Sequence, residues 1–343
     1  MVRLSPRGQQ ILHAIVCDYL ETVAPVSSKR LIERFDLGVS SATVRNAMAE
    51  LEDAELLEQP HTSSGRIPTS KAYRYYVDHI LTLRPLTSGE LASVEAIVRE
   101  TGDVSRLVRD SGRVLSVISR HTALVSAPSL ASAVCEGIEF VRVASGKVLV
   151  LFVMSSKVLC SQVVEDEGEF TQEQLERFGR YLNPMLMGLT LNKVRDRIDT
   201  ELDHERARFD EALAQALHLG ATALAQEDAE RELYVEGSVR FLDQPEFSDL
   251  AKTREVFRTL EEKRSVLRLL SAAMEGPGTQ VLIGPELVVE EMHGCAVVVA
   301  QYAHAGRPLG SLGVIGPARM DYARVIPLVG YVAQVLSQQM ERG

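Results

Sequence analysis

A short run of polar side chains near residue 40 has the residue types of a helix that reads nucleic acid. Ser40 and Ser41 precede an apolar repeat and can cap the helix that this repeat predicts. Thr43, Arg45 and Asn46 fall on its first two turns. Such side chains bond phosphate oxygens and base edges, and the first turns of a recognition helix enter the major groove. We therefore expect all five to contact DNA, although this segment alone fits a capped surface helix equally well.

A basic segment follows this helix and favours the DNA interpretation. Residues 60–77 contain three basic and no acidic side chains. Residues 56–59 and 66–68 have the pattern of short strands around a polar turn, so we predict a two-stranded wing beside the helix. Side chains on such a wing are placed to bind phosphates and sugar edges. With Ser41, the expected contacts of this kind are Lys29, His61, Ser63, Ser64, Arg66, Lys71 and Arg74.

Three other clusters are weaker candidates for chemistry. His61 and its neighbouring serines form a short polar loop without the buried base and carboxylate of a hydrolase. His293 and Cys295 are too few to hold a metal ion. Gly310, Gly313 and Gly316 recur at three-residue steps, which differs from a dinucleotide-binding fingerprint and indicates close packing of a strand. We expect no catalytic residue, metal or cofactor.

Apolar spacing places the DNA-reading segment in a small N-terminal domain. Helices are predicted over residues 7–20, 28–35 and 40–57, and a short turn with a glycine joins the last two. Three helices of this kind are typical of a helix-turn-helix. A further helix over 71–81 closes the unit, so we place the domain at residues 1–84.

The remainder of the chain alternates helical and strand-like segments, which predicts an α+β fold with a helical insertion. The predicted helices cover 90–120, 171–187, 193–234, 248–274 and 321–340. The predicted strands cover 138–144, 148–154, 158–165, 280–283, 296–302 and 309–315. The apolar stripe of the 193–234 stretch must bury against the 248–274 helix or a second copy, and we favour a dimer contact. Its candidate residues are Ile198, Leu202, Phe209 and Leu213.

Composition fits a reduced, cytosolic protein of several domains. The chain has 343 residues, 45% of them hydrophobic, with four widely separated cysteines. No segment resembles a signal core or a membrane span, so no membrane partner is expected. The formal net charge of −10 argues at first against DNA, but residues 1–84 carry ten basic and ten acidic side chains. The excess acid therefore lies after residue 84, and the local field rather than the total charge steers an anionic partner.

Several strings together resemble the HrcA family of heat-inducible transcription repressors. They follow the family in order over nearly the whole chain, and the longer ones are specific. Glu55 and Ala72 depart from it, because glycine is usual at both positions, and Glu55 puts the end of the preceding helix in doubt. The strings are SSATVRN (40–46), HTSSGRIPT (61–69), YRYYVD (73–78), QPEF (244–247), IGPE (283–286) and GVIGPARMDY (313–322).

The resemblance implies a winged helix-turn-helix domain, a GAF-like α+β domain over 90–165 and 275–343, and a largely helical dimerising domain inserted over 166–274. It also implies repression of chaperone operons by a homodimer on an inverted-repeat operator in double-stranded DNA, with activity dependent on the GroEL chaperonin. A regulator that uses the GAF-like domain as a small-molecule sensor remains the alternative.

Overall fold

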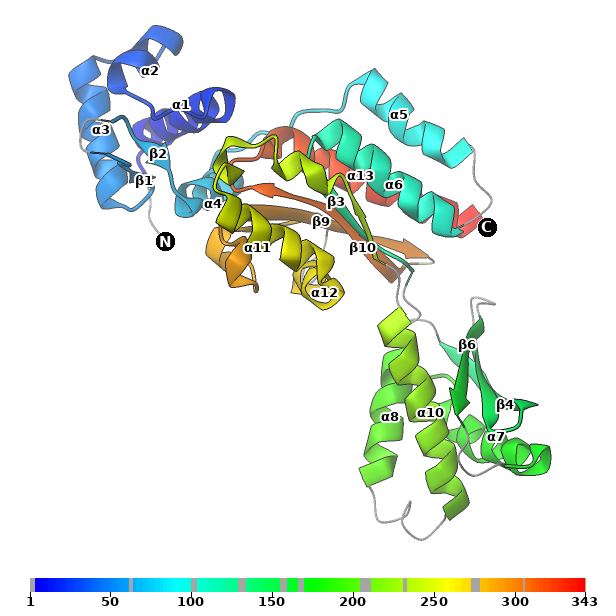
Figure 1. The fold of residues 1–343 in the computed structure, drawn as a ribbon. Coiled ribbons are helices and arrows are strands. Elements are labelled where there is room, and N and C mark those ends of the chain that lie inside the picture. The colour runs from blue at the N-terminus through cyan, green and yellow to red at the C-terminus, as the bar shows by residue number, and fades with distance from the viewer. Residues whose placement is uncertain are drawn as a thin grey trace. The chain divides into compact units, whose positions relative to one another are not determined.

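The computed structural model describes the chain in ten stretches that form two compact units (Figure 1). Unit 1 comprises Met1–Val125, Leu233–Tyr302 and Ser311–Gly343, and unit 2 comprises Ser126–Glu232 and Ala303–Gly310. The mixture of helices with several sheets confirms the predicted α+β class. The described residues are 4–61, 64–99, 104–128, 134–154, 159–165, 170–203, 211–230, 233–272, 278–304 and 306–342.

The first part of unit 1, which we call the head, runs from residue 4 to residue 80. Its helices begin at residues whose side chains accept a hydrogen bond from the first helical turn, namely Ser5, Ser27, Ser40 and Thr69. Each of its four helices buries apolar side chains. The elements are α1 (Pro6–Thr22), α2 (Ser28–Arg34), α3 (Ser41–Asp53), β1 (Leu57–Glu58), β2 (Ile67–Pro68) and α4 (Ser70–His79).

The rest of unit 1 is built on a five-stranded sheet of order β7-β3-β10-β9-β8. Figure 1 shows α6 and α13 against one face of this sheet and α11 and α12 against the other. Gly313 allows β10 to lie close to β9, because a Cβ there would stand 2.3 Å from the Val298 carbonyl oxygen. The strands are β3 (Thr122–Ser126), β7 (Leu233–Glu236), β8 (Gln280–Ile283), β9 (Cys295–His304) and β10 (Arg307–Pro317). The helices are α5 (Ser88–Arg99), α6 (Val104–Ser119), α11 (Leu250–Glu261), α12 (Lys263–Ala272) and α13 (Tyr322–Arg342).

Unit 2 is an antiparallel three-stranded sheet covered by helices. Its strands β4 (Cys135–Ala144), β5 (Lys147–Met154) and β6 (Leu159–Glu165) pair in the order β4-β5-β6. Every second side chain of β5 is buried, so one face of the sheet needs a cover. The helices α7 (Gln172–Leu186), α8 (Leu191–Asp203) and α10 (Glu211–Glu230) complete the unit.

The edges of unit 2 differ from the 166–274 insertion expected from the sequence. The β4–β6 sheet shares one hydrophobic core with α7, α8 and α10, so the strands belong with these helices. The helices α11 and α12 instead share a core with β9 and β10 in unit 1. They are also two helices where one was predicted, because Glu262 between them adopts an extended backbone.

Two of the four residues predicted as a dimer contact pack within one chain. Ile198 on α8 is fully buried in the core of unit 2, and Leu202 packs against the same core. We predicted that the apolar stripe with these residues packs against the 248–274 helix or a second copy. For Ile198 both predictions are wrong, because it packs inside its own unit. Phe209 lies outside the described residues, and of Leu213 only its place on α10 is described.

Candidate nucleic-acid interface

The start of α3 is fixed by hydroxyl groups. The Ser40 hydroxyl accepts a hydrogen bond of 3.2 Å from the Thr43 backbone N–H and lies 3.0 Å from the Thr43 hydroxyl. The Ser41 hydroxyl lies 3.2 Å from that of Ser28 on α2. These contacts join the starts of α2 and α3, so the first turn of α3 is held in a defined position.

Arg45 and Asn46 lie on the outer side of α3. Both side chains are exposed, whereas Val44, Ala47 and Met48 beside them are buried. Among the described residues, no ion pair or hydrogen bond engages the Arg45 guanidinium or the Asn46 amide. Arg45 therefore forms no ion pair with the acidic residues of its own helix.

The hairpin after α3 is fastened to the head through Gly65 and Arg66. The backbones of Val26 and Arg66 form an antiparallel bridge with two hydrogen bonds of 2.9 Å. A Cβ at Gly65 would stand 2.4 Å from the Val26 carbonyl oxygen, so only glycine allows this approach. The Arg66 side chain donates to Glu52 on α3 at 2.7 Å. The hairpin is therefore held at a fixed distance from α3.

The polar turn of this hairpin is closed by its own side chains. The Ser64 hydroxyl donates to the His61 carbonyl at 2.6 Å and accepts from the His61 backbone N–H at 3.0 Å. His61 is exposed, and Ser63 lies outside the described residues. Lys29 on α2 is also exposed, with a single 3.8 Å contact to Glu33. These cationic and polar groups remain open to a ligand.

The structure assigns Lys71 and Arg74 to contacts within the chain. The Lys71 ammonium lies 2.9 Å from Glu55. Arg74 uses Nε, Nη1 and Nη2 on Glu286, Asp78 and the Val281 carbonyl. Two of these partners belong to β8 and the turn after it, so Arg74 links the head to the larger sheet of unit 1.

A buried ionic contact between α1 and α2 was not foreseen from the sequence. The Asp18 side chain is fully buried, and Arg30 donates to it at 3.1 Å while Arg34 also pairs with it. Asp18 follows Ile11 and Ile15 at helical steps on the buried stripe of α1. An acid at such a position is the signal that could have revealed it, because buried carboxylates need a cationic partner.

Both departures from the family pattern are accommodated. Glu55 has φ 60°, and hydrogen bonds from Glu55 N–H to the Glu52 carbonyl and from Leu56 N–H to the Leu51 carbonyl close the end of α3. This is the Schellman geometry, in which glycine is usual. The helix therefore ends as the family pattern requires, with a strained residue directly after its C-cap. Ala72 is fully buried on α4 and keeps ordinary helical geometry.

Comparison with known proteins decides the family. The model of the HrcA protein C-terminal domain matches residues 105–326. The heat-inducible transcription repressor HrcA of Geobacter sulfurreducens is 38% identical over 342 residues, 99% of each chain. The chain belongs to the HrcA family. A repressor of the same name from Nitratidesulfovibrio vulgaris is 39% identical over 98% of each chain.

The HrcA resemblance extends to a known fold. A crystal structure described as that of a hypothetical protein superposes with a TM-score of 0.59 at 22% identity, over 99% of this chain and 98% of that chain. The HrcA family consists of heat-inducible transcription repressors, which is not a class of enzymes, and this confirms the predicted role in transcription repression. Among the described helices, none is long and apolar enough to cross a membrane.

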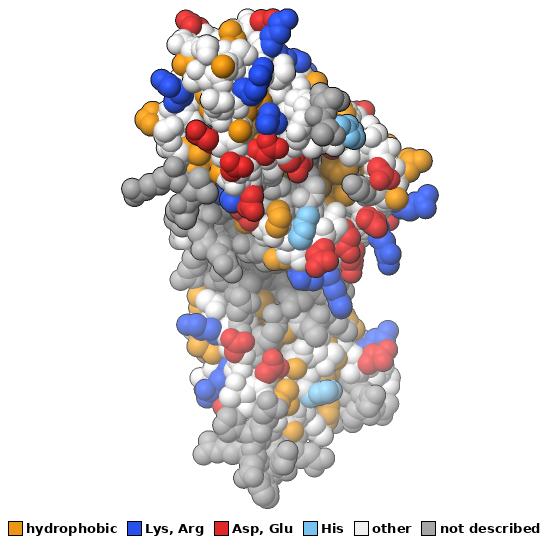
Figure 2. Space-filling model, turned by 90° about the vertical axis from the view of Figure 1, so that its left-hand side faces the viewer, with side chains coloured by type: hydrophobic (Ala, Val, Ile, Leu, Met, Phe, Trp, Pro, Cys, Tyr) orange, Lys and Arg blue, Asp and Glu red, His pale blue; other side chains and the backbone are white. Residues whose placement is uncertain are grey.

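The head of this HrcA chain lies within residues 1–84, which are balanced in charge, whereas the rest of the chain is acidic. Figure 2 shows basic side chains on the upper part of the molecule with acidic side chains among and below them, and further basic side chains lower down. The exposed basic side chains of α2 and α3 are Lys29, Arg34 and Arg45. The local field of the head therefore differs from that of the acidic chain as a whole.

Proposed function

We propose that this chain represses chaperone operons by binding an inverted-repeat operator through its head, which acts as a winged helix-turn-helix. The observation that carries the proposal is the exposure of Arg45 and Asn46, without partners among the described residues, on the first turns of a capped helix. A guanidinium and an amide at this place match the donor and acceptor edges of guanine and adenine.

The proposed contacts divide by role. Thr43, Arg45 and Asn46 read bases, and each good bidentate pair contributes about 1–3 kcal/mol of discrimination. The remaining contacts bind phosphates or sugars, and their affinity falls as the salt concentration rises. We retain Arg66 and Lys71 in this group, because an exposed or half-buried ion pair costs little to rearrange. We leave out Arg74, whose guanidinium is committed to β8 and Glu286. The phosphate and sugar group is Lys29, Ser40, Ser41, His61, Ser63, Ser64, Arg66 and Lys71.

The proposed arrangement of the other parts follows the family. A GAF-like domain forms the larger sheet of unit 1, and unit 2 is the inserted dimerising domain, with edges near residues 126 and 232. Two heads read two half-sites, as dimeric helix-turn-helix proteins do. GroEL maintains the active repressor, so that heat, by occupying the chaperonin with unfolded clients, releases the operons.

The deciding experiment is a binding titration of Arg45→Ala against the inverted repeats upstream of chaperone operons and against a random duplex. We expect operator affinity to fall about tenfold or more with a smaller loss on random DNA, because a base contact is removed. Arg66→Ala should weaken both duplexes equally, since a phosphate contact carries no sequence information.

Arg113→Ala supplies the matched control, because Arg113 is exposed on α6 outside the head. Equal operator affinity of Arg45→Ala and the unchanged chain would remove α3 from the interface. The same conclusion would follow if Arg45→Ala protected the inverted repeat in a footprint at the protein concentration that the unchanged chain needs.

A further inference from the structure

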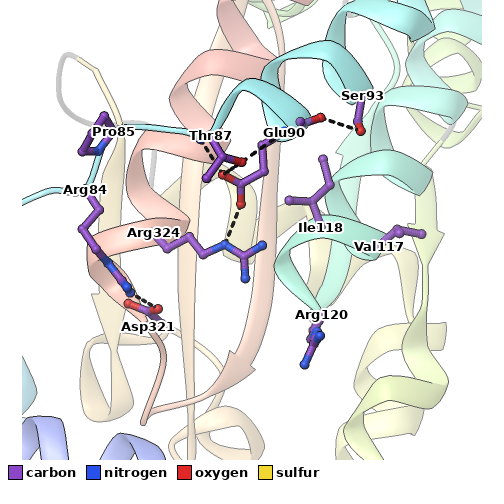
Figure 3. A pocket seen from close by; sticks show the side chains of 11 residues that line it. Arg84, Pro85, Thr87, Glu90, Ser93, Val117, Ile118, Arg120, Asp321 and Arg324 are labelled. Carbon is purple, nitrogen blue, oxygen red and sulfur yellow. Dashed lines mark hydrogen bonds and ion pairs between the residues drawn. The ribbon is translucent and has the colours of Figure 1, made fainter.

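Two adjoining hollows in unit 1 lie where the segment after the head meets the start of α13. The first has a volume of about 760 Å³ and is lined in part by Arg84, Arg120 and Arg324 (Figure 3). The second, of about 560 Å³, shares these three arginines and adds Arg319 and His121. Both volumes fall within the usual range of small-molecule binding sites.

The arginines of the first hollow keep unused hydrogen-bond donors. Figure 3 shows Arg84 paired with Asp321 and Arg324 paired with Glu90, the second at 2.7 Å. A guanidinium carries five N–H donors. The described contacts of these side chains use only Nη2 of Arg84 and Nε of Arg324. Their remaining donors are available to a ligand with several acceptor oxygens.

Arg120 leaves the positive charge of the first hollow unbalanced. Its side chain is exposed, and within the described part of the chain no carboxylate pairs with it. The lining of this hollow therefore has one more arginine than carboxylates. Arg120 also follows the last residue of α6 with φ 61°, a left-handed conformation that favours glycine. The fold thus holds an unpaired cation at a position where glycine would be less strained.

His121 adds a polar group to the second hollow. Its ring packs against β10, since a Cβ at Gly316 would stand 2.5 Å from the ring Nδ1. Among the described residues, none forms a hydrogen bond with either ring nitrogen. The imidazole therefore offers one donor and one acceptor beside the arginines.

We propose that these hollows bind a small multivalent oxyanion of the phosphate or pyrophosphate ester class, held by Arg84, Arg120 and Arg324. The planar guanidinium matches the spacing of phosphate oxygens, and several such groups around one hollow are typical of phosphate recognition. Arg319 is already bonded to Glu246 and Gln244 and forms the rim of the second hollow. The site is separate from the proposed DNA surface on α3 and does not depend on it.

The test uses the full chain without DNA, inorganic pyrophosphate as the probe, and sodium chloride to keep ionic strength constant. We expect pyrophosphate to raise Tm and to give a saturable calorimetric isotherm. Arg120→Gln should weaken binding about tenfold, the usual effect of losing a charged hydrogen bond. Arg113→Gln, at an exposed position on α6 that lines neither hollow, should bind as the unchanged chain does.

A second variant separates binding from folding. Arg120→Gly relieves the left-handed backbone, so it should unfold at a higher temperature than the unchanged chain and still fail to bind pyrophosphate. Equal weakening by Arg120→Gln and Arg113→Gln, or a Tm rise no greater than that in matched sodium chloride, overturns the proposal. The proposal is also overturned if random duplex DNA displaces pyrophosphate and Arg120→Gln abolishes this displacement. The hollow would then belong to the DNA surface.

Discussion

Glu55 occupies a left-handed backbone position that favours glycine. Its replacement by glycine should raise the free energy of unfolding by up to about 1 kcal/mol, because the Cβ clash disappears while the closing hydrogen bonds of α3 remain. The salt bridge with Lys71 is lost, but both side chains are largely exposed and the pair contributes little. Thermal unfolding of Glu55→Gly, with Glu55→Gln as the control for charge alone, measures the difference. A lower Tm for the glycine variant than for the glutamine variant would contradict this reasoning.

His121 should make unit 1 sensitive to mild acid. The pKa of this histidine is lowered from 6.5 to about 4, chiefly by burial and in part by the nearby charges of Arg319 and Arg240, while Asp321 acts in the opposite direction. Between these values the unfolded chain binds the extra proton, so the free energy of unfolding falls as pH decreases from 6.5 to 4. The free energy of unfolding can fall by at most roughly 3 kcal/mol through this histidine.

The measurement is the difference in Tm between about pH 7.5 and about pH 5, taken for the unchanged chain and for two histidine variants. His121→Gln should show a smaller difference between the two pH values than the unchanged chain. His218→Gln, at an exposed position on α10, should leave the difference unaltered. An identical acid-induced decrease in all three proteins would exclude His121 as its source.

At the scale of elements, the packing of α1 against α2 depends on one buried carboxylate. Asp18→Asn keeps the shape of the side chain but leaves Arg30 without its charged partner and Arg34 with Glu21 alone. We expect a loss of about 2–3 kcal/mol in stability. Glu21→Gln is the matched control, because Glu21 also pairs with Arg34 but is exposed, and its loss should cost less than about 1 kcal/mol. Urea titration of the three proteins measures both values, and equal stabilities would show that the buried pair contributes nothing.

Periodicity predicted most helices and strands, because their apolar spacing is regular. It missed β3 and β7, since β3 is buried at every residue and lacks alternation, and β7 follows a long charged helix. It placed Arg45 and Asn46 on the outer side of α3, as observed. It could not place Arg74, because the partner Glu286 is distant in sequence and is brought near only by the tertiary fold. The partner of Ile198 could not be predicted for the same reason. The spacing of its apolar stripe shows that the residue is buried but not which part of the chain, or which second copy, it packs against.

At the scale of the whole molecule, the proposed function places two heads on one operator. We expect two chains per inverted repeat, and a much weaker complex on a duplex with a single half-site, because the second contact is then lost. Analytical ultracentrifugation of the full chain with each duplex measures the stoichiometry. One chain per inverted repeat at saturation, with affinity equal to that for the half-site, would contradict the dimeric proposal.

The contacts of α4 bear on any attempt to study DNA recognition with a shortened protein. Tyr73 is 3% exposed, with its ring 6.3 Å from that of Tyr322, and Arg74 is bonded to Glu286. Cutting the chain after residue 84 would uncover an aromatic ring and leave a guanidinium with Asp78 as its remaining carboxylate. A truncated fragment would therefore be prone to self-association through a surface that the intact repressor never presents, and its oligomers would not report on operator pairing.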